Sequence, residues 1–421
     1  FADFDMVGKR IHSSISATND SVNSDLRANL ESTVHLLEKA NGGVGGVDVT
    51  IHPSKVFVRD TLFTIVQSQV IYNNEVLTVN NLSVEHASQH VVINGTAGRN
   101  SNDSIIADIN DIDVFYILNF VNFHTVDFTG KASGTAVVTK LFSKPEAEAN
   151  ITVENFTFES GRMGILKANA SWNNELEQID LLADCLDETR LTHIEGYVSP
   201  SQNSIDLAIT ADRTRGECLA GYTKSFFSDV DLTITGDVRV SGPLSAVNLT
   251  GDTRATGRFH VKALGTDYVL KNQRVVCVPN EICFVNDTII DKYGKLGIVN
   301  GQLHHKNLSQ LTFDVQVAPK NMLCYDFPTY DDDVFFGKAV FTGTCDIIGR
   351  PGQIVFNVNA KAEKGSFVEY NASNPDAITG QSFINWNNLK LDDSKAKATV
   401  GDDDDDFTSD IRLNVVANID E

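Results

Sequence analysis

Apolar and polar residues alternate along almost the whole chain, and this alternation constrains the fold more than any other feature of the sequence. In the segment "SIDLAIT", Ile205, Leu207 and Ile209 are separated by single polar or small residues. A period of two is that of a β-strand, whose successive side chains point to opposite faces of a sheet. Polar turn residues separate the runs, as is typical of antiparallel neighbours. The sequence therefore predicts a mostly β chain.

The alternating runs belong to a repeat of about a hundred residues. One marker of the repeat is a glycine followed, after a polar stretch, by an alternating run. A second marker is a glycine, a strand, a proline-containing turn and another strand. The two sets of glycines are Gly95, Gly196 and Gly301, and Gly134, Gly236 and Gly343. Two markers with the same period indicate a repeat protein.

A sheet with an apolar face must bury or cover that face. A series of sandwiches would need linkers between the repeats, and a parallel β-helix would repeat after far fewer residues. A single barrel of so many strands would leave a wide lumen. We therefore expect a long curled antiparallel or mixed β-sheet, a taco-like open groove of repeating units, with a few short helices. The expected repeat units are 1–129, truncated at its N-terminus, 130–235 and 236–336, and residues 337–421 are expected to be the truncated start of a C-terminal domain.

Three short segments are expected to be helical, at residues 30–42, 113–123 and 216–229. The second of them is rich in apolar residues, which would either plug the groove locally or pack as ordinary core. These residues are Phe115, Ile117, Leu118 and Phe120.

The net charge argues against one large class of partners. The 421 residues carry a formal net charge of −22, and an anionic surface is repelled by phosphate backbones, so we expect no nucleic-acid partner. The sequence contains no run of about 18 apolar residues, the length that a helix needs to span a bilayer. Both ends of the chain stop within alternating runs, and we expect the chain to be a piece of a longer protein.

Motifs of enzymes and of metal sites do not occur in the sequence. His304-His305 has no third ligand at metal spacing and is expected in a surface loop. The acidic runs Asp331–Asp333 and Asp402–Asp406 lack the alternating pattern of a calcium loop and are expected to be solvated. No G-x-S-x-G elbow marks a serine nucleophile. We therefore expect neither an enzyme nor a cofactor or metal site.

Six cysteines show no metal-ligand spacing, but two of them flank a turn at Pro279-Asn280. A three-residue turn would place Cys277 and Cys283 opposite each other across a hairpin. A disulfide between them could then form in an oxidising compartment. The alternative is that both are small, buried apolar residues.

The apolar sides of the alternating runs are the candidate functional surface. These residues would either line a groove that is open to ligands or form ordinary core closed by the opposite wall of the curl. The candidate lining residues are Val47, Val49, Ile51, Ile151, Val153, Ile205, Leu207, Ile209, Leu311, Phe313, Val315, Ile354, Phe356 and Val358.

The last part of the sequence resembles a known family. The resemblance is carried by residues 321–386, with "FGKAVFTGT" from Phe336, the Gly-Arg-Pro-Gly turn from Gly349, the segment "KGSFVEYNASNPDAI", and a late "SDIRLNV". This stretch is similar to the start of the C-terminal domain of the translocation and assembly module TamB family, within the AsmA-like group of bacterial proteins. The upstream repeats resemble the family in style more than in sequence.

The resemblance implies a periplasmic protein of the cell envelope, anchored in the inner membrane by a segment outside this sequence. Its β-groove would shield the acyl chains of phospholipid during transport between the inner and outer membranes. The resemblance also implies a partnership with an outer-membrane barrel of the BamA/TamA type in outer-membrane biogenesis. An alternative function is that of a scaffold or chaperone in protein secretion, which would assemble outer-membrane proteins of the autotransporter type by sheet-edge pairing.

Overall fold

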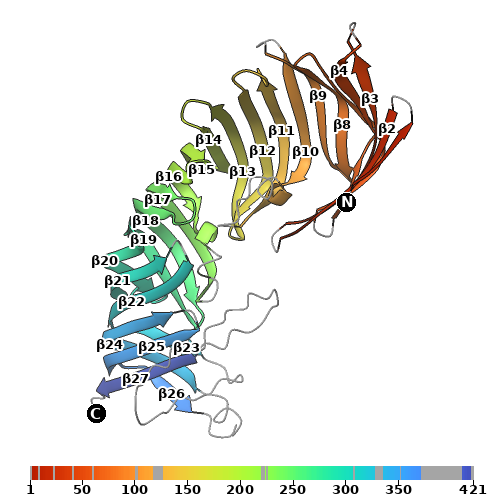
Figure 1. Ribbon diagram of the computed structural model, residues 1–421. Coiled ribbons are helices and arrows are strands. Elements are labelled where there is room, and N and C mark those ends of the chain that lie inside the picture. The colour runs from red at the N-terminus through yellow and green to blue at the C-terminus, as the bar shows by residue number, and fades with distance from the viewer. Residues whose placement is uncertain are drawn as a thin grey trace. The chain divides into compact units, whose positions relative to one another are not determined.

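The structure is a computed structural model, and it describes the chain except for short gaps and one long one. About 80% of the chain is strand and about 3% is helix, and the strands join into one long mixed sheet (Figure 1). The prediction of a mostly β, curled sheet with few helices is confirmed. The residues outside the described part are 1, 8–9, 22–23, 40–41, 59–60, 100–102, 117–126, 220–222, 224–225, 307–308, 328–334, 351, 371–409 and 419–421.

The chain divides into two compact units. Unit 1 is Phe1–Leu219 with Arg239–Ser245, and unit 2 is Ala220–Val238 with Ala246–Glu421. The segment boundaries expected from the sequence, after residues 129, 235 and 336, stay a prediction.

Unit 1 holds the first sixteen strands of the described chain. They are β1 (Ala2–Val7), β2 (Arg10–Ser21), β3 (Ser24–Glu38), β4 (Val44–Ile51), β5 (Ser54–Val58), β6 (Thr61–Ile65), β7 (Ser68–Asn73), β8 (Val76–His86), β9 (Gln89–Ala97), β10 (Ser104–Asp113), β11 (Phe128–Thr139), β12 (Glu146–Phe158), β13 (Gly161–Asn173), β14 (Gln178–Asp187), β15 (Arg190–Ser199) and β16 (Ser204–Arg215), followed by the 3-10 helix η1 (Gly216–Leu219).

The remaining strands belong to unit 2, except that the last residues of β17 count with unit 1. They are β17 (Phe227–Pro243), β18 (Asn248–Val261), β19 (Thr266–Val278), β20 (Glu281–Asp291), β21 (Leu296–Lys306), β22 (Ser309–Lys320), β23 (Met322–Phe327), β24 (Phe335–Arg350), β25 (Gln353–Ala362), β26 (Phe367–Tyr370) and β27 (Asp410–Asn418).

Most strands pair antiparallel with their neighbours in sequence, as in the run from β8 to β16. Some long strands pair with two different strands along the same edge. The strand β24 pairs with β22 and β23 on one side and with β25 and β26 on the other. Within the described residues, a parallel pairing joins β25 to β27.

The helix predictions fare less well than the strand predictions. Residues 30–42 lie largely in β3, so this helix prediction is wrong; hydrogen bonding to strands on both sides overrides the local pattern. The second segment forms one helical turn at residues 114–116, and Ile117, Leu118 and Phe120 lie outside the described residues. The third contains η1, but strand β17 already begins at Phe227.

The repeated glycines lie where two strands approach too closely for a side chain. Gly196 and Gly301 have φ angles of 144° and 135°, which L-residues rarely adopt. A Cβ atom on Gly196 would lie 2.0 Å from the carbonyl oxygen of Asp206 on the next strand, and one on Gly301 would lie 2.2 Å from that of Asp314. The sequence marker therefore reflects a backbone requirement inside the sheet.

A β-bulge accompanies several of these glycines. At Gly301, the bulge residue Asn286 has a φ of 53°, and its backbone N–H donates to the side-chain oxygen of Asn300, at 2.7 Å. The bulge inserts one residue, so that Phe284 and Asp287 lie on the same face although three positions separate them. The same contact, from 2.6 to 3.0 Å, joins Asn81 to Asn94, Asp111 to Ser133, Asn272 to Thr256, Asn286 to Asn300 and Asn321 to Thr342.

Replacing Gly95 by alanine should destabilise unit 1 by about 3 kcal/mol, because the new Cβ would lie 2.1 Å from the Ser104 oxygen and φ is 127°. Gly98, in the same part of the chain, is the matched control, since its Cβ would make only ordinary contacts at 3.5 Å. Urea unfolding followed by circular dichroism measures both variants. Equal midpoints for Gly95→Ala and Gly98→Ala would contradict this role of the glycine.

Removing the side-chain acceptor at Asn300 should cost about 1–2 kcal/mol, because the N–H of Asn286 would lose its partner. Asn300→Asp keeps an oxygen at this position and should retain most of the stability that Asn300→Ala loses. Thermal unfolding of the two variants tests the contact, and identical losses for both would show that the hydrogen bond is unimportant.

Candidate functional site

In unit 1 the strand register aligns apolar residues of neighbouring strands into rows across the sheet. We call the first row the central row and the second the adjacent row, and their common side the apolar face of unit 1. Neither row contains a charged or polar side chain. From β9 to β16 the central row is Ile93, Ala107, Ala136, Ala149, Ala170, Leu181, Gly196 and Leu207, and the adjacent row is Val91, Ile109, Gly134, Ile151, Ala168, Ala183, Ile194 and Ile209.

The predicted lining residues of β12 and β16 fall on this face. Leu207 lies in the central row, Ile151 and Ile209 lie in the adjacent row, and Val153 and Ile205 flank them on the same face. Every residue of the central row is only half-buried. Nothing in the described part of the chain therefore covers this row fully.

A third row on the same face is closed. It runs through Ala132, Val153 and Cys185, which are 0%, 3% and 2% exposed. Val114, in the helical turn after β10, and Phe156 complete the buried cluster over it. The apolar face is thus covered at one side and half-exposed across the central row, which is the geometry of an open trough.

The predicted residues Val47, Val49 and Ile51 lie on β4 and are half-buried. The register aligns Val49 with Val70 of β7, and through it with Val79 of β8 and on to Gly95. The apolar face therefore extends by register from β4 to β9, where Gly95 lies two residues from Ile93 of the central row.

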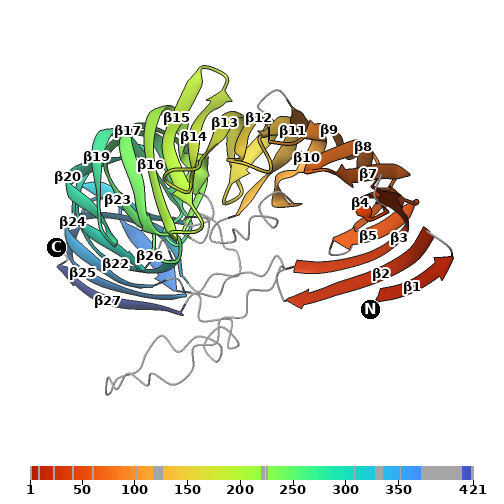
Figure 2. The same cartoon turned by 45° about the horizontal axis from the view of Figure 1, so that its top comes forward.

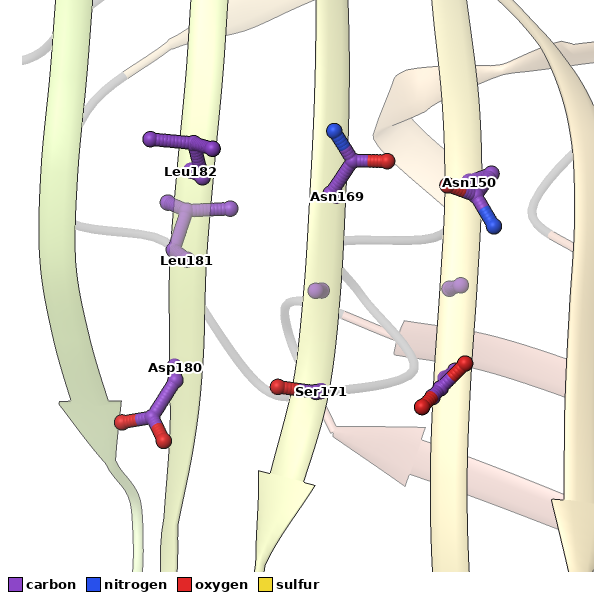
Figure 3. A pocket seen from close by; sticks show the side chains of 9 residues that line it. Asn150, Asn169, Ser171, Asp180, Leu181 and Leu182 are labelled. Carbon is purple, nitrogen blue, oxygen red and sulfur yellow. The ribbon is translucent and has the colours of Figure 1, made fainter.

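The opposite face of the same strands, which we call the polar face, carries polar and charged side chains together with exposed apolar ones such as Leu182. Asn150 and Asn169 project there beside each other, and Leu181 and Leu182, which are consecutive, point to opposite sides of β14 (Figure 3). A shallow hollow on this face is lined by Asn150, Asn169, Ser171, Asp180 and Leu182, among others. Its side chains offer carboxylates and amides but no cation or nucleophile–base pair, so it suggests no chemistry.

In unit 2 the predicted residues again share one face. Leu311, Phe313 and Val315 lie on β22, and Ile354, Phe356 and Val358 lie on β25. The intervening strand β24 joins the two sets by register, and the three strands lie side by side in Figure 2. Phe313, Ile354 and Phe356 are nevertheless buried, at 9%, 5% and 9% exposure, so this part of the face is core in the structure.

An ionic cluster surrounds the buried Asp187 at one end of strands β13 to β16. The sequence analysis did not predict it. Asp187 is 5% exposed; Arg215 donates to its carboxylate, and the Arg162 and Arg190 guanidiniums lie 2.8 and 3.9 Å from it. Burial raises the pKa of Asp187, but the hydrogen bond from Arg215 and the charges of Arg215 and Arg162 outweigh burial and lower it. The charged groups thus gather at the strand ends and leave the apolar rows uncharged.

Of the two alternatives for Cys277 and Cys283, the structure does not contain the disulfide, and both thiols are free. The turn has two residues, not three, so Cys277 pairs with Ile282, and Cys283 with Val276. The two cysteines consequently project from opposite faces of the hairpin. Burial raises the pKa of Cys277 to about 11 and that of Cys185 to about 12.

We expect iodoacetamide at pH 8 to leave Cys185 and Cys277 unmodified in the folded protein, because the thiolate is the reactive form and burial suppresses it. Peptide mass spectrometry reads the modification at each site. The same treatment in urea should modify all six cysteines, and a residual 277–283 disulfide after unfolding would contradict the observed register.

The histidine pair is placed differently from the prediction. His304 and His305 both lie in β21, not in a surface loop, and His305 is 5% exposed. Burial lowers the pKa of His305. Among the described residues no group of three or more His, Cys, Asp or Glu side chains is arranged to hold a metal ion. The two acidic runs lie outside the described residues.

Comparisons with known proteins identify no relative. Neither the protein-family models nor the curated proteins nor the solved structures contain a match to this chain. In the described part of the chain, no helix combines the length and the apolar character that crossing a membrane requires.

Proposed function

We propose that the chain is a non-enzymatic β-groove protein that shields acyl chains during phospholipid transport between the inner and outer membranes. The observation that carries the proposal is the central row of unit 1, in which eight successive strands each contribute an uncharged, half-buried residue. The proposal includes the periplasmic location, the inner-membrane anchor outside this sequence and the BamA/TamA-type barrel partner that the family resemblance implies.

The chemistry of the central row fits an acyl chain better than a polar ligand. Its side chains are alanine, leucine and isoleucine, and the backbone donors and acceptors of these strands are used in the sheet. Transfer of apolar surface out of water is favourable by about 25 cal/mol per Å² and has no directional requirement. A ligand could therefore occupy any part of the row and slide along it, as a lipid in transit must.

The test is a charge placed in the central row. Leu207→Asp introduces a carboxylate that an acyl chain cannot solvate, and it should lower lipid recovery, because a chain can no longer occupy the β16 end of the row. Ala208→Asp is the matched control, because Ala208 is the next residue on the same strand and is exposed on the polar face. Mass spectrometry of organic extracts from the purified proteins measures bound phospholipid, and circular dichroism checks that each variant is folded.

Phospholipid recovered equally with the parent and with Ala208→Asp, but in a smaller amount with a folded Leu207→Asp, would support the proposal. Equal recovery from both variants would contradict it. Phe313→Asp is unsuitable for this test, because Phe313 is buried in unit 2 and its loss would measure folding.

A second candidate function is assembly of outer-membrane proteins through a sheet edge. It is favoured by β27, whose Val415 and Val416 are 49% and 63% exposed and whose one described partner strand is β25. An edge binds by backbone hydrogen bonds. Under this alternative, Leu207→Asp and Ala208→Asp would support assembly equally well, and the parent would carry no phospholipid.

A further inference from the structure

We propose that the polar face of unit 1 is a site of N-linked glycosylation. The inference goes beyond the proposed function and does not depend on it, because it concerns the face opposite to the apolar rows. Each acceptor is the first residue of an Asn-x-Ser/Thr triplet, or sequon, which oligosaccharyltransferases recognise. On strands β8 to β13 the acceptors are Asn81, Asn94, Asn150, Asn155 and Asn169.

The fold places these asparagines on the polar side of the sheet, and all five are exposed. Asn94 follows Ile93 of the central row in the same strand and therefore projects to the opposite side. Asn150 and Asn169 are register partners and lie beside each other on the polar face (Figure 3). Glycans on this side leave the apolar rows of unit 1 uncovered.

Two of the five asparagines are bulge residues. Asn81 and Asn155 have φ angles of 49° and 51°. The register of β8 shifts between Val79 and Leu82, which both lie on the apolar face, and the register of β12 shifts around Asn155 in the same way. The bulge therefore turns each asparagine away from the apolar face.

Hydrogen bonds of the side-chain nitrogen separate these five residues from the other asparagines of the same strands. The other described asparagines between residues 76 and 174 all donate from Nδ2. The donors and acceptors are Asn80 to Gln69, Asn110 to Ser88 and Asn173 to Asp180, at 3.2 Å each, and Asn174 to Pro145. Within the described part of the chain, no residue accepts a hydrogen bond from Nδ2 of the five sequon asparagines. Composition explains why asparagine, serine and threonine are common on this face, but not this division.

The amide of Asn94 already has the orientation that a glycan needs. Its Oδ1 accepts a hydrogen bond from the backbone N–H of Asn81, at 2.6 Å, and this contact directs Nδ2 away from the backbone. Glycosylation replaces one hydrogen of Nδ2 and keeps Oδ1, so the contact at the bulge is retained. Thr96, two residues further on the same face, supplies the hydroxyl of the sequon.

Two exposed apolar side chains of the polar face lie directly beside sequon asparagines. Ile106 is 38% exposed and pairs with Asn94, and Leu182 is 47% exposed and pairs with Asn169. A sugar ring has C–H groups that can cover such side chains, while its hydroxyls remain in water. Glycans at these positions would therefore reduce the apolar area that the polar face exposes.

The co-reactant is an oligosaccharide linked to a polyprenyl diphosphate. The bond that forms joins Nδ2 to C1 of the first sugar, and the bond that breaks joins C1 to the diphosphate oxygen. The polyprenyl diphosphate leaves with the electron pair, and Nδ2 loses one proton. The sequon hydroxyl of Asn81 belongs to Ser83, which is 2% exposed, so transfer to this residue precedes the folding of β8.

The experiment identifies glycans on the protein purified from the cells that make it. Peptide-N-glycosidase F in oxygen-18 water converts an occupied asparagine to a labelled aspartate, and peptide mass spectrometry locates the label. Untreated peptides are searched for added sugar mass in parallel, so that a glycan resistant to the enzyme is also found. We expect occupancy at each of the five residues, and each is scored separately.

Two variants and one internal residue are the controls. Thr96→Ala, made in the same cells, should lose the modification at Asn94 alone, whereas Thr96→Ser keeps a hydroxyl and should retain it. Asn300 precedes a glycine, as Asn94 does, but starts no sequon. It is the control for spontaneous deamidation and should carry no label.

The proposal is overturned if the peptides of the five asparagines carry neither label nor added sugar. It is also overturned if Thr96→Ala retains the modification at Asn94, or if Asn300 is labelled as strongly as Asn94. An occupied residue supports its own assignment, and a residue that stays unmodified beside occupied ones overturns its own. Phospholipid recovery is not part of this readout, so the result is independent of the proposed function.

Discussion

The hydrogen-bond ladder between neighbouring strands decides which side chains share a face, and every other property of the sheet depends on that choice. A slip of one residue would turn a whole strand over and place its polar residues among the apolar rows. The glycines and bulges help to keep the strands in this register. At Gly301 the bulge at Asn286 absorbs one residue, and the side chain of Asn300 holds the bulge in place. The central row of unit 1 exists because eight strands keep their register.

The apolar face of unit 1 and the sheet face of unit 2 that contains Phe313 have similar compositions. They differ in how far other side chains cover them. Leu207 and Phe313 come from equally regular alternating runs, yet Leu207 is half-buried and Phe313 is buried. Phe226, which comes from a segment nearly ninety residues before Phe313 in the chain, packs on the cluster that contains Phe313. The burial of an apolar row thus depends on residues outside the row.

The sequence was sufficient for the local features and insufficient for those that join distant segments. Alternation identified the strands and the shared face of Ile205, Leu207 and Ile209, because the period of a strand is local. Leu30, Val34 and Leu37 have the spacing of a helix face, whereas Leu30, Val34 and Leu36 share one face of a strand. Only the pairing on both sides of β3 decides between the two. The bulges were unpredictable because one inserted residue leaves no mark in composition.

The turn at Pro279-Asn280 shows that a small error in a predicted turn length can change the predicted positions of side chains. One residue of difference in turn length moved Cys277 and Cys283 from facing positions to opposite faces of the sheet. The cluster around Asp187 escaped prediction for another reason, since Arg162, Arg190 and Arg215 belong to three different strands. Only the fold brings their charges to one carboxylate.

Pairing between sequence neighbours also has a consequence for how the chain is made. Each hairpin from β8 to β16 can close as soon as its second strand leaves the ribosome, without waiting for residues still to be synthesised. The pairing of β25 with β27 is the exception. It is parallel, and it joins residues 353–361 to residues 410–418 across a long intervening segment. Closing that loop costs entropy before the pairing contributes any stabilisation, so β27 joins the sheet later than a strand that forms a hairpin with its neighbour.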